Sequence, residues 1–257
     1  MRNLALGVVV WVLALAGHAA AADFKVIHLD GMALKWGQPA RGTPVTITYA
    51  LADAPHPDSE RINCKQLGPV APVLRRSKLD RGDVAGALQT ALGMWSRAAG
   101  VSFRPADSLE SADLVVGGQG EPRGIAFTNV EHARTTVPGR GRITSAAICL
   151  NPDAAWETTA DGDDETYELT RVLAHEIGHV IGLNHPGRSG PLMGYSYRED
   201  LASLQPGDRA GAMWLYGPAD GVRVAGRMSR GVSADAPTPP ALPLPSDSHL
   251  AIQRPRN

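Results

Sequence analysis

The chain lacks a strong charge of either sign. Its 257 residues include 25 lysines and arginines against 26 acidic residues, which gives a formal net charge of −1. That balance provides no electrostatic reason to expect nucleic acid or an anionic membrane surface as a partner. With 43% hydrophobic and 20% charged residues, the composition is typical of a soluble globular protein large enough to bury one good core.

Long hydrophobic runs are missing everywhere except at the N-terminus. There Arg2 precedes an apolar run over residues 4–16, and small residues up to Ala22 provide an A-x-A cleavage site before Asp23. The run is short for a transmembrane helix. The pattern therefore predicts a signal peptide over 1–22 and a secreted, periplasmic or extracellular protein without stable membrane insertion after cleavage. An uncleaved membrane anchor is the alternative.

Cysteine is scarce, with only Cys64 and Cys149 in the chain. An even number of cysteines in an oxidising compartment favours a disulfide between them. Two unrelated buried thiols are the alternative.

Periodicity predicts short strands and three helices between residues 34 and 217. Alternating apolar residues indicate a strand over 45–50, and further strands are expected at 101–105, 112–118, 124–129 and 143–150. The last should place Ile143, Ser145, Ala147 and Cys149 on one face. One helix should begin after Asp80 or Asp83 and stop at Gly100. A second should contain the stretch HEIGHVIGLNH described below, and a third should cover residues 205–217. Residues 54–72 and 134–142 are expected to be loops.

Two segments have compositions of their own. The acidic stretch ADGDDETYE (160–168) is consistent with a calcium site, or with a solvated loop whose negative charge favours the N-terminus of the following helix. Beyond Pro218 the chain is proline-rich and aperiodic, which indicates a disordered or extended tail over 219–257. The predicted globular domain is therefore 23–218.

The most informative stretch is HEIGHVIGLNH, from His175 to His185. On a helix, His175 and His179 lie four residues apart and point the same way, so both imidazoles can reach one ion. Gly182 can adopt a positive φ and end the helix in a sharp turn, after which His185 provides a third nitrogen. Three protein ligands leave a fourth position for water, which is typical of a catalytic Zn²⁺. The alternative is an ordinary amphipathic helix without a metal, which would explain the spacing of the apolar residues but would leave the histidines unexplained.

The same stretch matches the HExxHxxGxxH signature of the metzincin metallopeptidases. Met193 in PLMGYSY resembles that clan's Met-turn, which underlies the zinc. Within the clan the chain resembles the matrixins, especially small bacterial members, through LKWGQPARGTPVTITYAL, ALGMWSRAAGVSF, SADLVVG and LQPGDRAGAMWLYG. The resemblance covers roughly residues 34–217. It implies an α+β zincin fold with a twisted mixed β-sheet of about five strands, an active-site helix and a C-terminal helix.

The resemblance also implies a function. The chain would be a secreted zinc endopeptidase in which one zinc-bound water is activated by Glu176, the general base. Residues 123–130 would form an edge strand that pairs with an extended protein or peptide substrate, although an ordinary strand within the sheet is the alternative. A zinc-holding peptide-binding module or pseudoenzyme without turnover is the rival function. A further rival is a membrane-anchored structural protein whose histidines are incidental.

Three features depart from the matrixin pattern. No cysteine-switch propeptide is present, so that latency mechanism is not expected. The region 118–142 contains a single histidine, His132, which argues against the family's structural zinc. Tyr195 follows Met193 by two residues, as in the serralysin and astacin branches, where such a tyrosine can also bind zinc. Tyr195 could therefore assist the chemistry, or Tyr195 or Tyr197 could line the specificity pocket.

Overall fold

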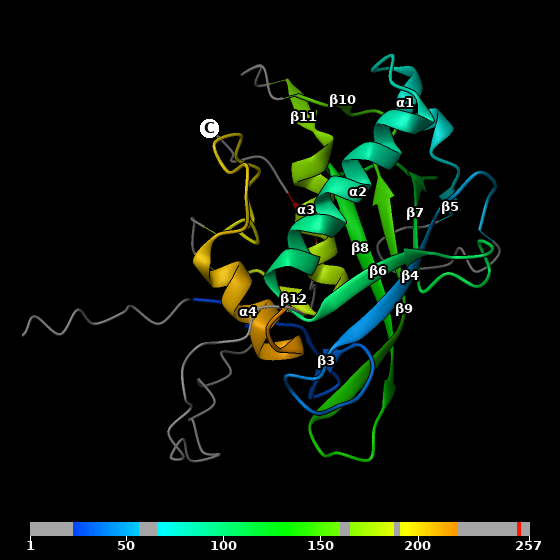
Figure 1. The fold of residues 1–257 in the computed structure, drawn as a ribbon. Helices are drawn as coiled ribbons and strands as arrows, with labels where there is room; N and C mark the ends of the chain where they lie inside the picture. Colours follow the sequence, from blue (N-terminus) through cyan, green and yellow to red (C-terminus); the bar gives the residue numbers. More distant parts are fainter. Residues whose placement is uncertain (1–22, 57–65, 160–164, 188–190, 220–250, 253–257) are drawn as a thin grey trace, which may run out of the picture.

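The computed structural model of the chain describes residues 23–56, 66–159, 165–187, 191–219 and 251–252 (Figure 1). The expected signal peptide, Cys64 and nearly all of the 219–257 tail lie outside these ranges. Within them, no helix has both the length and the apolar character needed to cross a membrane. Cys149 is disulfide-bonded and no described cysteine is free. Because Cys64 lies outside the described residues, its pairing with Cys149 stays a prediction.

A mixed sheet is the centre of the fold. Its five long strands follow the order β8-β9-β7-β4-β6, with β8 antiparallel to β9 and the other neighbours parallel. The bounds are β4 (Val45–Leu51), β6 (Val101–Pro105), β7 (Leu114–Gln119), β8 (Ala126–Arg134) and β9 (Arg140–Leu150). Shorter strands extend it, namely β2 (His28–Leu29), β3 (Met32–Lys35), β5 (Leu67–Gly68) and β13 (Ala251–Ile252). The α+β fold expected from the sequence is confirmed.

The first long helix, α2 (Arg81–Ala98), begins where its sequence predicts. Asp80 is the N-cap. Its Oδ1 accepts from Asp83 N at 3.0 Å, and Asp83 Oδ2 accepts from Asp80 N at 2.8 Å. This capping box provides partners for two backbone N–H groups at the helix start that have none within the helix. The buried face of the helix consists of Val84, Ala87, Leu88, Ala91, Leu92 and Trp95.

The motif helix α3 (Leu169–Val180) lies beside α2 on one face of the sheet (Figure 1). Glu168 caps it by accepting from Thr170 N and Arg171 N at 2.8 and 3.0 Å. It ends before Gly182, which has φ +99°, and a Cβ there would lie 2.6 Å from Leu34 O. Glycine is therefore required at this turn for both its conformation and its lack of a side chain.

The last helix, α4 (Pro206–Tyr216), closes the domain and ends at Gly217, as expected. The remaining short elements are α1 (Ala71–Arg75), β1 (Lys25–Val26), β10 (Ala155–Glu157), β11 (Thr166–Glu168) and β12 (Leu183–Asn184). Tyr216 connects α4 to the motif helix, because its hydroxyl donates to Ile181 O at 2.8 Å. Burial raises the pKa of Tyr216 well above its ordinary value, so its hydroxyl stays a neutral donor.

The interpretation of the 143–150 strand was wrong about its faces. Ile143 packs in the main core with Ala146 and Ile148, whereas Ala147 and Cys149 belong to a small cluster with Val115. The cause is a bulge: Glu131 pairs with Ser145 but His132 pairs with Ile143, so the alternation shifts by one residue.

Loop boundaries were also misjudged. Part of the expected 54–72 loop is β5 and α1, and the expected 134–142 loop is shorter because β8 runs to Arg134 and β9 starts at Arg140. Long antiparallel pairing of β8 with β9 extends both strands past their apolar stretches, where sequence periodicity gives no signal.

Candidate metal and catalytic site

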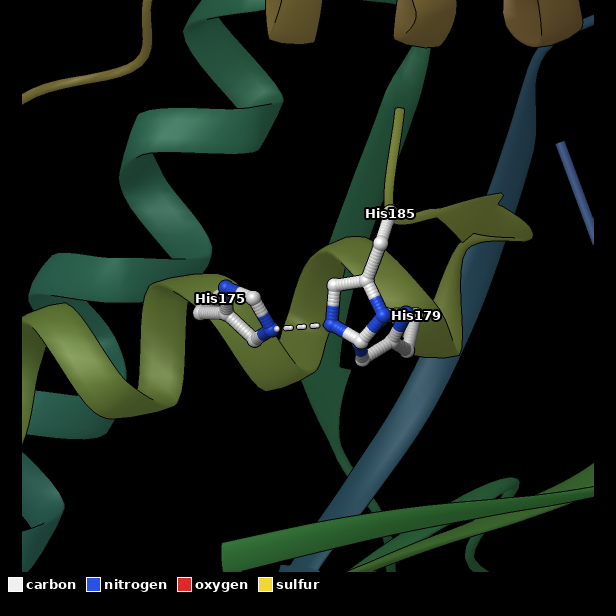
Figure 2. A group of neighbouring side chains, drawn as sticks. All are labelled: His175, His179 and His185. Atoms are coloured by element: carbon white, nitrogen blue, oxygen red, sulfur yellow. Dashed lines mark hydrogen bonds between the residues drawn. The ribbon is translucent and has the colours of Figure 1, made fainter. Parts of the chain in front are cut away.

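Three buried histidines meet at the end of the motif helix. His175 and His179 come from α3, and His185 follows β12 after the turn at Gly182 (Figure 2). The Nε2 atom of His185 lies 3.2 Å from Nε2 of His175 and 3.2 Å from Nε2 of His179. Among the described residues this is the only group of three or more His, Cys, Asp or Glu side chains able to hold one metal ion.

The spacing of these nitrogens fits a zinc ion. Two nitrogen ligands on a tetrahedral zinc, each about 2.0–2.1 Å from the ion, lie roughly 3.3–3.4 Å apart. The observed separations of 3.2 Å are close to that value. The set of three imidazoles is also one of the known ligand sets of catalytic zinc, which leaves a position open for water or substrate.

Backbone carbonyls fix which ring nitrogen of each helix histidine is available. His175 Nδ1 donates to Leu192 O at 2.6 Å, and His179 Nδ1 donates to Leu183 O at 2.9 Å. With the proton on Nδ1, each Nε2 carries a lone pair directed at the common point. Lone pairs this close repel unless a cation lies between them, so the arrangement itself favours metal binding.

Burial keeps the three rings neutral. It is the main reason that the pKa of His175 is lowered to about 4 and that of His185 to about 2, while the pKa of His179 lies well below its ordinary value. The neighbouring imidazoles lower the pKa of His179 and His185 further, and the Lys25 charge contributes at His185. Neutral imidazole is the form that binds metal, so the site is ready for an ion at neutral pH.

Glu176 lies between the histidines on α3 and is fully buried. Thr128, on β8, donates its hydroxyl to Glu176 Oε2 at 2.5 Å and also lies 3.1 Å from Glu176 O. This contact holds the carboxylate against the sheet, on the helix that carries His175 and His179. Sequence reasoning missed Thr128 because nothing in a strand pattern shows which helix residue lies opposite it.

Met193 packs against the motif helix at Gly178, the residue before His179. It is buried, and a Cβ added to Gly178 would lie 2.1 Å from its Sδ atom. Gly178 therefore allows the Met193 side chain to approach α3 between the two helix histidines. The flexible thioether thus fills space against the helix.

Asp208 anchors the Met193 turn and was not recognised from the sequence as more than a helix-start residue. Its buried carboxylate accepts from Leu192 N at 2.9 Å, Met193 N at 3.2 Å and Gln205 N at 2.7 Å. Burial raises its pKa, although these backbone donors act in the opposite direction. Leu192 O in turn accepts from His175, so Asp208 supports the orientation of this ring through one peptide unit.

The two tyrosines after Met193 occupy different places. The Tyr195 ring stacks on His185 with centroids 3.9 Å apart and is 55% exposed. Tyr197 is buried, its hydroxyl accepts from Glu168 N at 2.8 Å, and it packs against Tyr167. Tyr195 thus borders the metal site, whereas Tyr197 supports the start of α3.

The N-terminal residues support the third histidine. β1 pairs antiparallel with β12, aligning Lys25 with Asn184, and Ile27 N donates to Gly182 O at 2.8 Å. Asn184 Oδ1 then accepts from His185 N at 2.8 Å. Residues 25–26 carry no strand signal in the sequence, because two residues are too few for periodicity.

Two further metal sites were considered from the sequence, a second zinc near His132 and a calcium ion in the acidic stretch 160–168. His132 Nε2 lies 3.2 Å from Asp30 Oδ2, and it belongs to no three-ligand cluster among the described residues. The acidic residues 161–164 lie outside the described residues, so calcium binding there stays a prediction.

Comparison with known proteins agrees with this geometry. The Matrixin family model matches residues 73–217. Metalloendoproteinase 1-MMP of Arabidopsis thaliana is 32% identical over 150 residues, which are 55% of this chain and 40% of that protein. Interstitial collagenase of Sus scrofa is 30% identical over 151 residues (55% and 30%), and matrilysin of Mus musculus is 30% identical over 150 residues (55% and 54%).

The chain spans between 30% and 54% of the length of these three relatives. The family match nevertheless covers more than half of the chain, from α1 to the end of α4, and includes every histidine of the site as well as Glu176, Met193 and Asp208. On the strength of that match and of the three converging imidazoles, the chain belongs to the matrixin family.

Proposed function

We propose that this protein is a secreted zinc endopeptidase that hydrolyses peptide bonds with Glu176 as general base. The observation that carries the proposal is the convergence of three neutral histidine nitrogens, together with a buried glutamate next to His175 on the same helix whose carboxylate is held by Thr128. The similarity to a metalloendoproteinase, a collagenase and a matrilysin supports the same class of reaction.

Metal binding and proton transfer would be carried out by different residues of the site. His175, His179 and His185 hold the zinc, which when bound polarises the scissile carbonyl and acidifies water. Glu176 accepts a proton from the attacking water and later delivers it to the leaving amine.

Thr128 keeps Oε2 of Glu176 in one place through these two transfers. A fixed carboxylate needs no reorganisation at the moment of reaction, which is the usual benefit of a buried catalytic group.

The substrate would be an extended peptide paired with β8. Along one edge β8 pairs with β9, and the motif helix α3 packs close to β8. A peptide that adds as a further strand would gain main-chain hydrogen bonds and pass beside Glu176.

The experiment that tests this function uses mature protein and a peptide library, with and without a zinc chelator, with products read by mass spectrometry. Chelator-sensitive cleavage is expected. A zinc-loaded protein that binds peptides but cleaves none would instead favour the pseudoenzyme, and a protein that purifies without zinc would remove the metal from the proposal.

Tyr195 would take part in the chemistry as a donor to the oxyanion of the tetrahedral intermediate. Its ring already stacks on His185. Tyr195→Phe keeps the ring and deletes the hydroxyl, so we expect a fall in kcat with little change in KM, up to about 10²–10³-fold where such donors have been removed.

If Tyr195 only lines a specificity pocket, the phenylalanine variant will keep the wild-type kcat on the best substrate and shift the side chain preferred at the cleavage site. Profiling both proteins on one peptide library separates the two outcomes. Tyr197→Phe is the matched control, because that hydroxyl binds Glu168 N instead of facing the site.

A further inference from the structure

The C-terminal strand β13 lies on the open edge of β8. Ala251 is aligned with Phe127 and Ile252 with Ala126, in antiparallel register. β13 also lies against α3, the helix of His175, Glu176 and His179, where it is visible as the short red segment in Figure 1. A segment distant in sequence thus reaches the strand that forms one side of the site.

This pairing reaches to within one residue of the catalytic groups. Phe127, opposite Ala251, is followed by Thr128, and the Thr128 hydroxyl contacts Glu176 Oε2 at 2.5 Å. The order β13-β8-β9 places β13 on the side of β8 that β9 leaves open. The backbone groups that β8 directs to this edge at residues 126–127 cannot bond to β13 and to an incoming peptide at the same time.

We propose that the C-terminal segment around Ala251–Ile252 is an intramolecular occupant of the peptide-binding edge and competes with substrate for β8. The inference rests on the proposed function for the identity of that substrate. From Tyr216 at the end of α4 to Ala251, the chain has ample length to span the domain, since extended residues cover about 3.3–3.6 Å each. Because the occupant is part of the same chain, its binding does not depend on protein concentration.

Such an occupant has a specific kinetic signature. Only the fraction of molecules with a free β8 edge can bind substrate, so the apparent KM increases by the reciprocal of that fraction. At saturating substrate the segment is displaced, and kcat is unchanged. Loss of the β13 pairing should therefore lower KM and leave kcat alone.

The test replaces both paired residues in the full chain, as Ala251→Pro with Ile252→Pro, because proline cannot donate to a strand ladder. A matched control carries Ala241→Pro and Leu242→Pro, which add the same two prolines ahead of β13. Two measurements are made on all three proteins: hydrogen–deuterium exchange of a peptide covering 124–130, and KM and kcat on a short peptide substrate.

We expect faster exchange at 124–130 and a several-fold lower KM only in the 251/252 variant, and recovery of the wild-type KM when a synthetic peptide of residues 246–257 is added. Unchanged exchange in that variant overturns the docking, and faster exchange with unchanged KM overturns the competition. If none of the proteins hydrolyses peptide, the endopeptidase function fails, while exchange still decides whether the segment occupies β8.

Discussion

His185→Ala is expected to abolish zinc binding and peptide hydrolysis together. His185 Nε2 is the atom that lies 3.2 Å from both other metal-binding nitrogens, so its loss leaves only two protein ligands. Catalytic zinc sites use three. The same result is expected for His175→Ala and His179→Ala, measured as metal content of purified protein and as the rate of peptide cleavage.

The matched control is His132→Ala. His132 lies on β8 and pairs with Asp30, away from the three site histidines, so its replacement should keep both zinc and activity. Full zinc occupancy in any one of the three site variants would contradict the assignment of that histidine as a ligand.

A thermal-shift experiment separates loss of the metal from loss of the fold. A ligand that binds only the native state stabilises it by RT ln(1 + [L]/Kd), which is about 2.7 kcal/mol at a hundred times Kd. Added zinc should therefore raise the Tm of the metal-free wild type and of His132→Ala, and should not raise that of His185→Ala. A cooperative transition in the variant without zinc shows that the domain still folds.

The convergence of the three histidines was predictable because their spacing follows directly from helix geometry. Residues four apart share a helix face, and a glycine with positive φ turns the chain back, so His175, His179, Gly182 and His185 could be placed without coordinates. The structure has the φ of +99° at Gly182 and the converging nitrogens that this reasoning required.

The supporting residues were not predictable in the same way. Asp208 reaches the turn at Met193 from α4, and Thr128 reaches Glu176 from β8. Both contacts join elements far apart in sequence, and neither residue has a local pattern that names its partner. The same is true of Gly178: a side chain at this position is excluded only because Met193 packs against it in the folded protein.

The sheet shows where periodicity fails. The strand core at 45–50 has a regular alternation and was found with correct bounds to within one residue. In β9 a single extra residue at the bulge exchanges the faces, so that Ile143 packs with Ala146 instead of with Ala147. A two-residue strand such as β13 has no period to detect, and its partner strand alone determines its place.

Glu176→Gln is expected to keep zinc and lose most of the rate. Glutamine has nearly the same shape and can still accept from Thr128 through its amide oxygen, so the buried contact is preserved. It cannot take up a proton at neutral pH, and general acid–base catalysis typically contributes 10²–10⁴-fold. We therefore expect kcat to fall by that range with wild-type metal content, measured under single-turnover conditions with metal analysis of the same sample.

Thr128→Val in the same assay tests the positioning of the Glu176 carboxylate, whereas Glu176→Gln tests the carboxylate itself. Valine keeps the shape and deletes the hydroxyl that donates to Glu176 Oε2. A hydrogen bond to a charged group contributes about 1.5–3 kcal/mol, so we expect kcat to fall by roughly 10- to 100-fold with little change in KM. Thr128→Ser should restore most of the rate, because it returns the hydroxyl.

The double variant Thr128→Val/Glu176→Gln tests whether Thr128 acts through Glu176. If it does, removing the hydroxyl should cost little once the carboxylate is gone, and the two effects on kcat should be strongly non-additive. Multiplicative losses would instead mean that Thr128 supports the strand by itself. Wild-type turnover in Glu176→Gln would remove the general base from the mechanism, and it would leave the three histidines as a zinc site whose water is activated by some other group.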